Sequence, residues 1–275
     1  MNIFVRFPEG RDRALTFSYD DGVIQDKRMV ELLDRHGMRG TFNLNSGCFR
    51  AEDDTKSRRM TEREIVELFE KGNHEVACHG VTHPYLETLP PAEAVLEVLE
   101  DRRNLERLFG KPIRGMAYPF GTYNDRVINV LRDCGIVYSR TVSSTEKFEL
   151  PSDWLRLPAT CHHNNPRLME LAKTFVEKDL RDRNAKLFYL WGHTYEFADN
   201  DNWNVIEEFM DYMAGRDESI WYATNMEIYN YLRDYSQLIF SVGCDIVENP
   251  TARRLWFSRH GQIYSVGAGE TLKLK

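Results

Sequence analysis

The sequence lacks long apolar stretches, a disulfide pattern and an excess of basic charge. It contains no apolar run of the ~20 residues that a membrane-spanning helix needs. Its five cysteines are odd in number and irregularly spaced, which is typical of reduced thiols. The formal net charge of -7 argues against nucleic acid as a partner, because affinity for phosphate backbones comes from clustered Lys and Arg. We therefore expect neither a membrane nor a nucleic acid as the partner.

The first residues also lack the organisation of a signal peptide. Residues 1–6 have no basic segment followed by an apolar one, and no cleavage site of small residues follows them. Internal repeats and low-complexity segments are absent as well. Together with the reduced cysteines, this predicts a cytoplasmic protein.

Short β-type runs alternate with helical patterns along most of the chain. This alternation predicts parallel strands joined by helices, and 275 residues suit a single α/β barrel. From about residue 238 the pattern changes to β-type runs separated by turn residues such as Asn249-Pro250. We therefore expect an α/β domain over residues 1–237 and a small C-terminal β segment over residues 238–275, packed on the barrel.

Several polar and aromatic residues directly follow predicted strands. In barrels of parallel strands the chemistry lies where strands end and loops begin. A single convergent site is therefore expected at these positions. The residues are Asp20, Asp21, His79, the segment Tyr118–Phe120 and His193.

His79 and His83 are four residues apart, so on a helical turn both can reach one metal ion. Two imidazoles and one carboxylate make a set of three ligands with open positions, as a catalytic metal needs. A bound divalent ion lowers the pKa of water towards about 7 and polarises a carbonyl group. The alternative reading is a chance pair of surface histidines.

Asp20 and Asp21 are adjacent carboxylates that repel each other when both are ionised. A metal ion on one of them would leave the other free as a general base. The alternative is an acidic pair at a helix start, where Asp is favoured. His193 follows Gly192 and can donate a proton to a departing amine near neutral pH. The alternative reading of His193 is an ordinary polar residue at the end of a strand.

With these motifs the chain resembles the polysaccharide deacetylase family, carbohydrate esterases that remove N- or O-acetyl groups from chitin-like, peptidoglycan and xylan substrates. The resemblance covers roughly residues 12–236. Thr16–Gly22 is similar to the family's first motif, His79–His83 to its second, and Leu187–His193 to its late motif. The resemblance implies a distorted (β/α) barrel of seven or eight parallel strands.

The resemblance also implies roles for the candidate residues. Asp20 would be the general base and His193 the general acid, and the backbone amide of Phe120 would help to stabilise the oxyanion. One divalent metal ion would be held by Asp21, His79 and His83. We expect zinc, although cobalt, nickel, iron and manganese also suit these ligands. Tyr118 and Trp154 are further expected substrate contacts.

One position departs from the family pattern. The third motif carries an arginine two residues before its proline, where it orients the base, but Ala117 precedes Pro119 at that distance here. Arg156, two residues after Trp154, is the expected replacement. Without such a partner, Asp20 would be a base of different strength.

Three functions follow from these observations. The first is a metal-dependent hydrolase that removes an acetyl group, most simply N-acetyl, from a sugar or small saccharide. The second is a cyclic amide or imide hydrolase on the same fold. The third is a non-catalytic carbohydrate-binding relative, with aromatics such as Trp154 stacking on sugar rings. Edge strands in the C-terminal segment would allow the chain to pair into a homo-oligomer.

Overall fold

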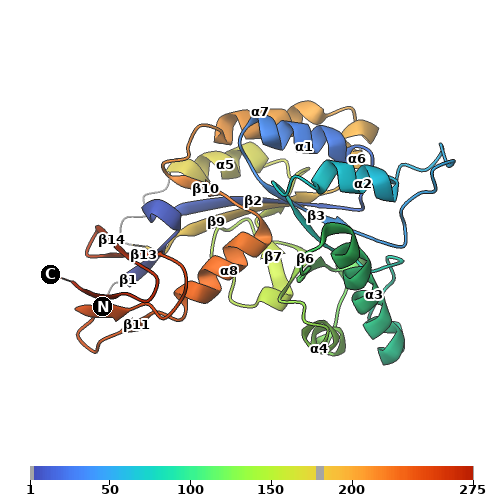
Figure 1. Ribbon diagram of the computed structural model, residues 1–275. Coiled ribbons are helices and arrows are strands. Elements are labelled where there is room, and N and C mark those ends of the chain that lie inside the picture. Colours follow the sequence, from blue (N-terminus) through green and yellow to red (C-terminus); the bar gives the residue numbers. More distant parts are fainter. Residues whose placement is uncertain (1–2, 178–182, 275) are drawn as a thin grey trace.

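The computed structural model describes residues 3–177 and 183–274, which form a parallel sheet surrounded by helices (Figure 1). Every pairing in the main sheet is parallel, which confirms the predicted α/β class. Its strands are β2 (Arg13–Asp20), β3 (Gly40–Leu44), β4 (Glu75–Cys78), β5 (Gly115–Ala117), β6 (Tyr138–Ser144), β7 (Leu157–Ala159), β8 (Cys161–His162), β9 (Lys186–Gly192) and β10 (Ile220–Tyr222).

The strands follow the order β7-β6-β5-β4-β3-β2-β9-β8, and β10 pairs with the start of β2. The strands β7 and β8, at the two ends of this order, are separated in the chain by Thr160 alone. The amide of Glu146, after β6, donates to the carbonyl of Thr160 at 2.8 Å, and the amide of Thr160 donates to the carbonyl of Tyr189 in β9 at 2.8 Å. The segment 157–162 therefore joins the two edges of the sheet into a distorted ring.

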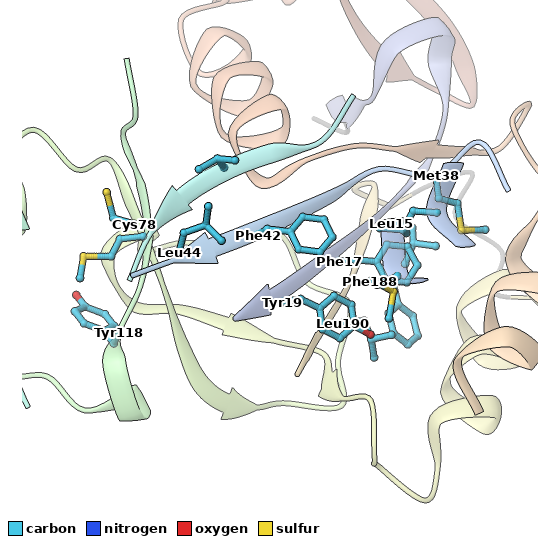
Figure 2. Packing of buried hydrophobic residues seen from close by; sticks show 14 of the residues in the cluster. Leu15, Phe17, Tyr19, Met38, Phe42, Leu44, Cys78, Tyr118, Phe188 and Leu190 are labelled. Carbon is cyan, nitrogen blue, oxygen red and sulfur yellow. The ribbon is translucent and has the colours of Figure 1, made fainter. Parts of the chain in front are cut away.

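Helices cover the outside of this ring (Figure 1). Their apolar faces pack on outward side chains of the strands, among them Leu15, Phe17 and Tyr19 of β2, and Figure 2 shows these residues together with Phe42 and Leu190. The helices are α1 (Asp26–Arg35), α2 (Glu62–Phe69), α3 (Pro91–Phe109), α4 (Asp125–Asp133), α5 (Leu168–Glu177), α6 (Thr194–Asp199), α7 (Trp203–Met213) and α8 (Asn225–Tyr235). Short 3-10 turns cover Pro8–Gly10, Pro119–Gly121 and Trp154–Arg156.

Polar residues occupy alternate positions of the same strands. Thr16 of β2 bonds to Asn225 at 2.9 Å, and the hydroxyl of Tyr138 in β6 donates to Glu75 of β4 at 2.6 Å. Burial raises the pKa of the Glu75 carboxyl, although three hydrogen bonds oppose the shift. Because side chains alternate along a strand, Asp20 lies on the same side of β2 as Thr16.

The C-terminal residues form two small antiparallel sheets. Strand β1 (Ile3–Arg6) pairs with β13 (Leu255–Arg259), which pairs with β14 (Gln262–Val266). The second sheet contains β11 (Ile239–Phe240), β12 (Ile246–Glu248) and β15 (Thr271–Lys273). Both chain ends lie at this part of the molecule (Figure 1). The pairing of β1 means that an N-terminal strand contributes to the first of these sheets.

The division into residues 1–237 and 238–275 stays a prediction, and residue 275 lies outside the described residues. Among the helices of residues 3–177 and 183–274, none combines the length and apolarity needed to cross a membrane.

Candidate active site

The predicted polar residues converge at the carboxyl ends of the strands. Asp20 ends β2, His79 follows β4 and His193 follows β9. Two residues that were not predicted, Asn43 of β3 and Arg140 of β6, reach the same place. Five strands or strand ends thus contribute to one site, as expected for a parallel barrel.

Asp20 lies at the centre of this group and is almost fully buried. Its Oδ1 accepts a hydrogen bond from Asn43 at 2.8 Å. Its Oδ2 lies 3.8 Å from Nε2 of His79 and 3.8 Å from Nε2 of His193. One carboxylate oxygen therefore lies equally close to His79, a candidate metal ligand, and to His193, the candidate acid.

Arg140 forms a buried ion pair with Oδ2 of this carboxylate, the oxygen that also faces the two histidines. Its Nη2 contacts Oδ2 of Asp20, and its guanidinium lies 4.4 Å from the ring centre of Trp191. Burial alone would raise the pKa of Asp20, but Arg140, followed by His79 and His193, lowers it to about 2. Asp20 is therefore ionised throughout the neutral range.

Arg140 is paired directly with Ala117 in the register of β5 and β6. The guanidinium expected from position 117 thus comes from the neighbouring strand at the same level. The expectation that Arg156 supplies it is wrong. Arg156 is itself exposed at the end of a 3-10 turn, where Asp153 and Asp125 bind its guanidinium at 2.6 and 2.5 Å.

The three expected metal ligands lie together. Ligand atoms of Asp21, His79 and His83 all lie within 4.8 Å of one another. Nδ1 of His79 lies 2.8 Å from the carbonyl oxygen of Ala117, which requires a proton on Nδ1 and leaves the lone pair of Nε2 free. That Nε2 lies 3.1 Å from Nε2 of His83. Two imidazole nitrogens that face each other beside a carboxylate fit a divalent cation.

The protonation of this group also suits a metal ion. Burial lowers the pKa of His79 to about 4, and burial likewise lowers the pKa of His83. Both imidazoles are therefore neutral near pH 7, the form that binds metals. Asp21 and His83 have left-handed backbone φ angles of 89° and 58°, which are uncommon outside glycine and tend to occur at functional sites.

His193 is held by a carboxylate on its own helix. Its Nδ1 lies 2.8 Å from Oε1 of Glu196, so Nδ1–H donates there and Nε2 faces Asp20. Burial would lower the pKa of His193, but the hydrogen bond to Glu196 and the charges of Asp20 and Asp21 outweigh it and raise the pKa above its ordinary value. His193 is thus suited to carry a proton near neutral pH.

Glu196 also contacts two further histidines, His162 and His163. Nε2 of His162 lies 3.4 Å from its Oε2, and Nε2 of His163 lies 3.0 Å from the same atom. His162, His193 and Glu196 are close enough for a second metal group. However, the amide of Asn164 donates to Nδ1 of His162 at 3.1 Å, which leaves the proton of a neutral ring on Nε2. This geometry favours a hydrogen-bonded cluster over a ligand set.

The predicted aromatic contacts are placed in two ways. Phe120 is half-exposed, and its ring centre lies 4.3 Å from that of His83 and 3.9 Å from that of Tyr85. Tyr118 is buried on the outer face of the strands, where its hydroxyl donates to the carbonyl of Leu155 at 2.8 Å (Figure 2). Trp154 packs edge-on against Tyr229 of α8. Phe120 therefore adjoins the site, whereas the structure does not bring the side chains of Tyr118 and Trp154 into it.

Comparison with solved structures finds the same fold in two chains and a partial match in a third. A candidate polysaccharide deacetylase from Mycobacterium smegmatis aligns with a TM-score of 0.57 and 14% identity, over 84% of this chain and 94% of that one. The peptidoglycan deacetylase PdaC from Bacillus subtilis aligns with a TM-score of 0.53 and 14% identity, over 84% and 96% of the two chains. The deacetylase PplD of Streptococcus pyogenes, solved with acetate, aligns over 46% of this chain and 55% of its own, with 20% identity and a TM-score of 0.42.

A search of curated protein sequences finds no match. The family model described as polysaccharide deacetylase matches residues 8–139, a range that contains Asp20, Asp21, His79 and His83 and ends before Arg140 and His193. Over residues 8–139 the chain is therefore similar to the polysaccharide deacetylase family.

Proposed function

We propose that this protein is a metal-dependent deacetylase that hydrolyses the N-acetyl group of a sugar or small saccharide. The observation that carries the proposal is the position of Asp20, whose Oδ2 lies 3.8 Å from Nε2 of both His79 and His193. A water molecule held near His79 would lie within reach of a carboxylate base, and the leaving nitrogen within reach of an imidazolium acid.

Asp21, His79 and His83 would hold the divalent ion, most simply zinc. When bound there, the ion polarises the acetyl carbonyl and makes a water molecule more acidic. His79 would bind through Nε2, since its Nδ1 is engaged by the carbonyl of Ala117, and His83 would bind through the Nε2 that faces it. Cobalt, nickel, iron and manganese suit the same donors, because affinity order alone does not select one metal.

Asp20 would act as the general base. Its carboxylate is ionised, and Arg140 and Asn43 fix both of its oxygens. It would take a proton from the attacking water as the water oxygen bonds to the acetyl carbon. The backbone amide of Phe120 would donate to the oxyanion that forms, because preorganised donors stabilise charge that develops in the transition state.

His193 would act as the general acid. The bond between the acetyl carbon and the nitrogen breaks, and the amine leaves with the proton from Nε2 of His193. Glu196 supports this role in two ways, since it fixes the orientation of the ring and favours the protonated form. Acetate and the free amine are the products.

The surface beside His83 suits a sugar ring. Phe120 and Tyr85 stack nearly parallel, with an interplanar angle of 10°, and each is 47% exposed. Aromatic faces combine a large apolar area with preferred stacking geometries, so this pair could receive the apolar face of a saccharide. This arrangement supports an acetylated sugar over a substrate without such a face.

Acetate release from N-acetylglucosamine oligomers, measured with added zinc, tests the proposal. We expect turnover by the wild-type protein, and turnover lower by about 10²–10⁴-fold in Asp20→Asn and His193→Ala. Both variants should retain the metal. Loss of metal in Asp20→Asn would show that the roles of Asp20 and Asp21 are exchanged. Ring opening of cyclic amides without acetate release would favour the cyclic amide hydrolase, and binding without either reaction would favour the non-catalytic relative.

A further inference from the structure

Arg59 contacts the carboxylate that is expected to bind the metal. Its Nη2 lies 2.9 Å from Oδ1 of Asp21, and its Nη1 donates to the backbone carbonyl of the same residue. Nη1 also donates to Oδ1 of Asn45 at 3.1 Å. Both side chains of this ion pair are mostly buried, with 22% of Arg59 and 13% of Asp21 exposed.

The backbone on both sides of Arg59 sets its position relative to Asp21. Val23 and Arg59 form an isolated antiparallel bridge. The amide of Ile24 donates to the carbonyl of Arg58 at 2.8 Å, and the amide of Met60 donates to the carbonyl of Gly22 at 2.9 Å. The loop before α2 is thus attached to the residues that follow Asp21, and the guanidinium is directed at Asp21 by this pairing.

The same guanidinium is connected to the histidine ligands through Asn45. The Asn45 side chain is buried, and its Nδ2 donates to the carbonyls of His79 at 2.6 Å and of Gly80 at 3.0 Å. A continuous set of hydrogen bonds therefore runs from Asp21 through Arg59 and Asn45 to the backbone of His79. It joins loops that follow three neighbouring strands, β2, β3 and β4.

We propose that Arg59 is a positioning residue: it holds the carboxylate of Asp21 in the orientation that binds the metal ion. The inference rests on the proposed metal site. A carboxylate has about four lone-pair sites, so an oxygen bound to Arg59 leaves acceptors for a cation. Partners of this kind around metal ligands typically change metal affinity by about 10–100-fold when they are removed. The positive charge of Arg59 opposes this effect, because it repels a bound cation. Removal of the charge alone would therefore strengthen metal binding.

The test is the Kd for Zn²⁺, measured by competition with a chromophoric chelator at pH 7, together with the Tm of each metal-free protein. We expect Arg59→Ala to weaken binding by about 10–100-fold. Arg59→Lys keeps the charge but loses the planar fork that reaches Asp21 and Asn45 together, so it should weaken binding as well. Arg58→Ala is the matched control, because Arg58 is adjacent and equally charged but pairs with Asp199 and lies over Tyr195. Its Kd should stay near that of the wild type.

Two results would overturn the inference while leaving the metal site intact. Tighter or unchanged zinc binding in Arg59→Ala would show that Arg59 acts only through its charge or only in folding. If Arg59→Ala does not fold, Arg59→Lys decides, and a Kd equal to that of the wild type would contradict the positioning role. Failure of the wild-type protein to bind zinc, cobalt or nickel would overturn the proposed function itself, which distinguishes the two failures.

Discussion

Arg140 lies directly opposite Ala117 in the parallel register of β5 and β6, and its guanidinium contacts the buried carboxylate of Asp20. The guanidinium that the resemblance led us to expect at position 117 of β5 is thus found on β6, at Arg140. The side chain of Arg140 is 1% exposed and that of Asp20 is 3% exposed. Each charge therefore depends on the other, because an unpaired charge is costly in a protein interior.

Removal of Arg140 should destabilise the protein strongly. Arg140→Ala leaves the carboxylate of Asp20 buried without its main partner, which typically costs about 3–5 kcal/mol of unfolding free energy. Urea denaturation of the metal-free protein at pH 7 measures this loss. Arg156→Ala is the control, and as a surface change it should stay within about 0.5 kcal/mol of the wild type. A similar small change in Arg140→Ala would contradict the assigned ion pair.

The double variant Arg140→Ala/Ala117→Arg tests whether the two positions are equivalent. It returns the arginine to the adjacent strand at the same level, and Arg140→Ala vacates space for the longer side chain. We expect higher acetate release than in Arg140→Ala alone. Equal activity in the two variants would show that the position of the guanidinium on β6 matters in itself.

Glu196 should set the alkaline limb of the pH profile. The acid His193 is active when protonated, so kcat/KM falls as the pH rises through its pKa. That pKa lies above the ordinary value, since Glu196, Asp20 and Asp21 together outweigh burial. Glu196→Gln removes one of these charges and should move the alkaline limb to lower pH. Glu170→Gln, which changes an exposed residue paired with Arg167, should leave the limb in place. An unmoved limb in Glu196→Gln would remove this carboxylate from the account.

Asp26 predicts a pH dependence of stability beside the site. It is fully buried, accepts from the hydroxyl of Thr194 at 2.6 Å, and burial raises its pKa to about 8. The folded state binds the proton of Asp26 more tightly than the unfolded state does. The contribution of Asp26 to the unfolding free energy therefore falls as pH rises from about 4 to about 8, by up to about 1.4 kcal/mol per pH unit. The asparagine of Asp26→Asn cannot ionise. The unfolding free energy of this variant should therefore increase relative to that of the wild type as pH rises. A constant difference between the two proteins from pH 4 to pH 8 would contradict the raised pKa.

The metal and acid–base residues could be predicted from sequence because they lie in short motifs at strand ends. Asp20, Asp21, His79 and His193 each follow a recognisable β-type run, and parallel strands bring their ends together. The fold class alone was therefore enough to predict that these residues lie in one site. The roles assigned to them stay predictions until activity and metal binding are measured.

Arg140 could not be predicted in this way. It lies inside β6, 120 residues from Asp20, and no spacing links the two. Only the register of β5 and β6 reveals that it faces Ala117. Arg156 failed as the replacement because the side chain of Asp153, which caps the same 3-10 turn, binds it. Tyr118 was expected at the site but lies on the outer face of the strands. A shift of one residue moves a side chain to the opposite face of a strand, and the sequence pattern did not fix this position.

The metal content of the purified protein, by elemental analysis, tests the central claim most directly. The wild type should carry about one equivalent of a divalent metal, as expected for one group of three ligands, after incubation with zinc if necessary. The double variant His79→Ala/His83→Ala should carry almost none. Absence of metal from the wild type, even after incubation with zinc, cobalt or nickel, would contradict the account.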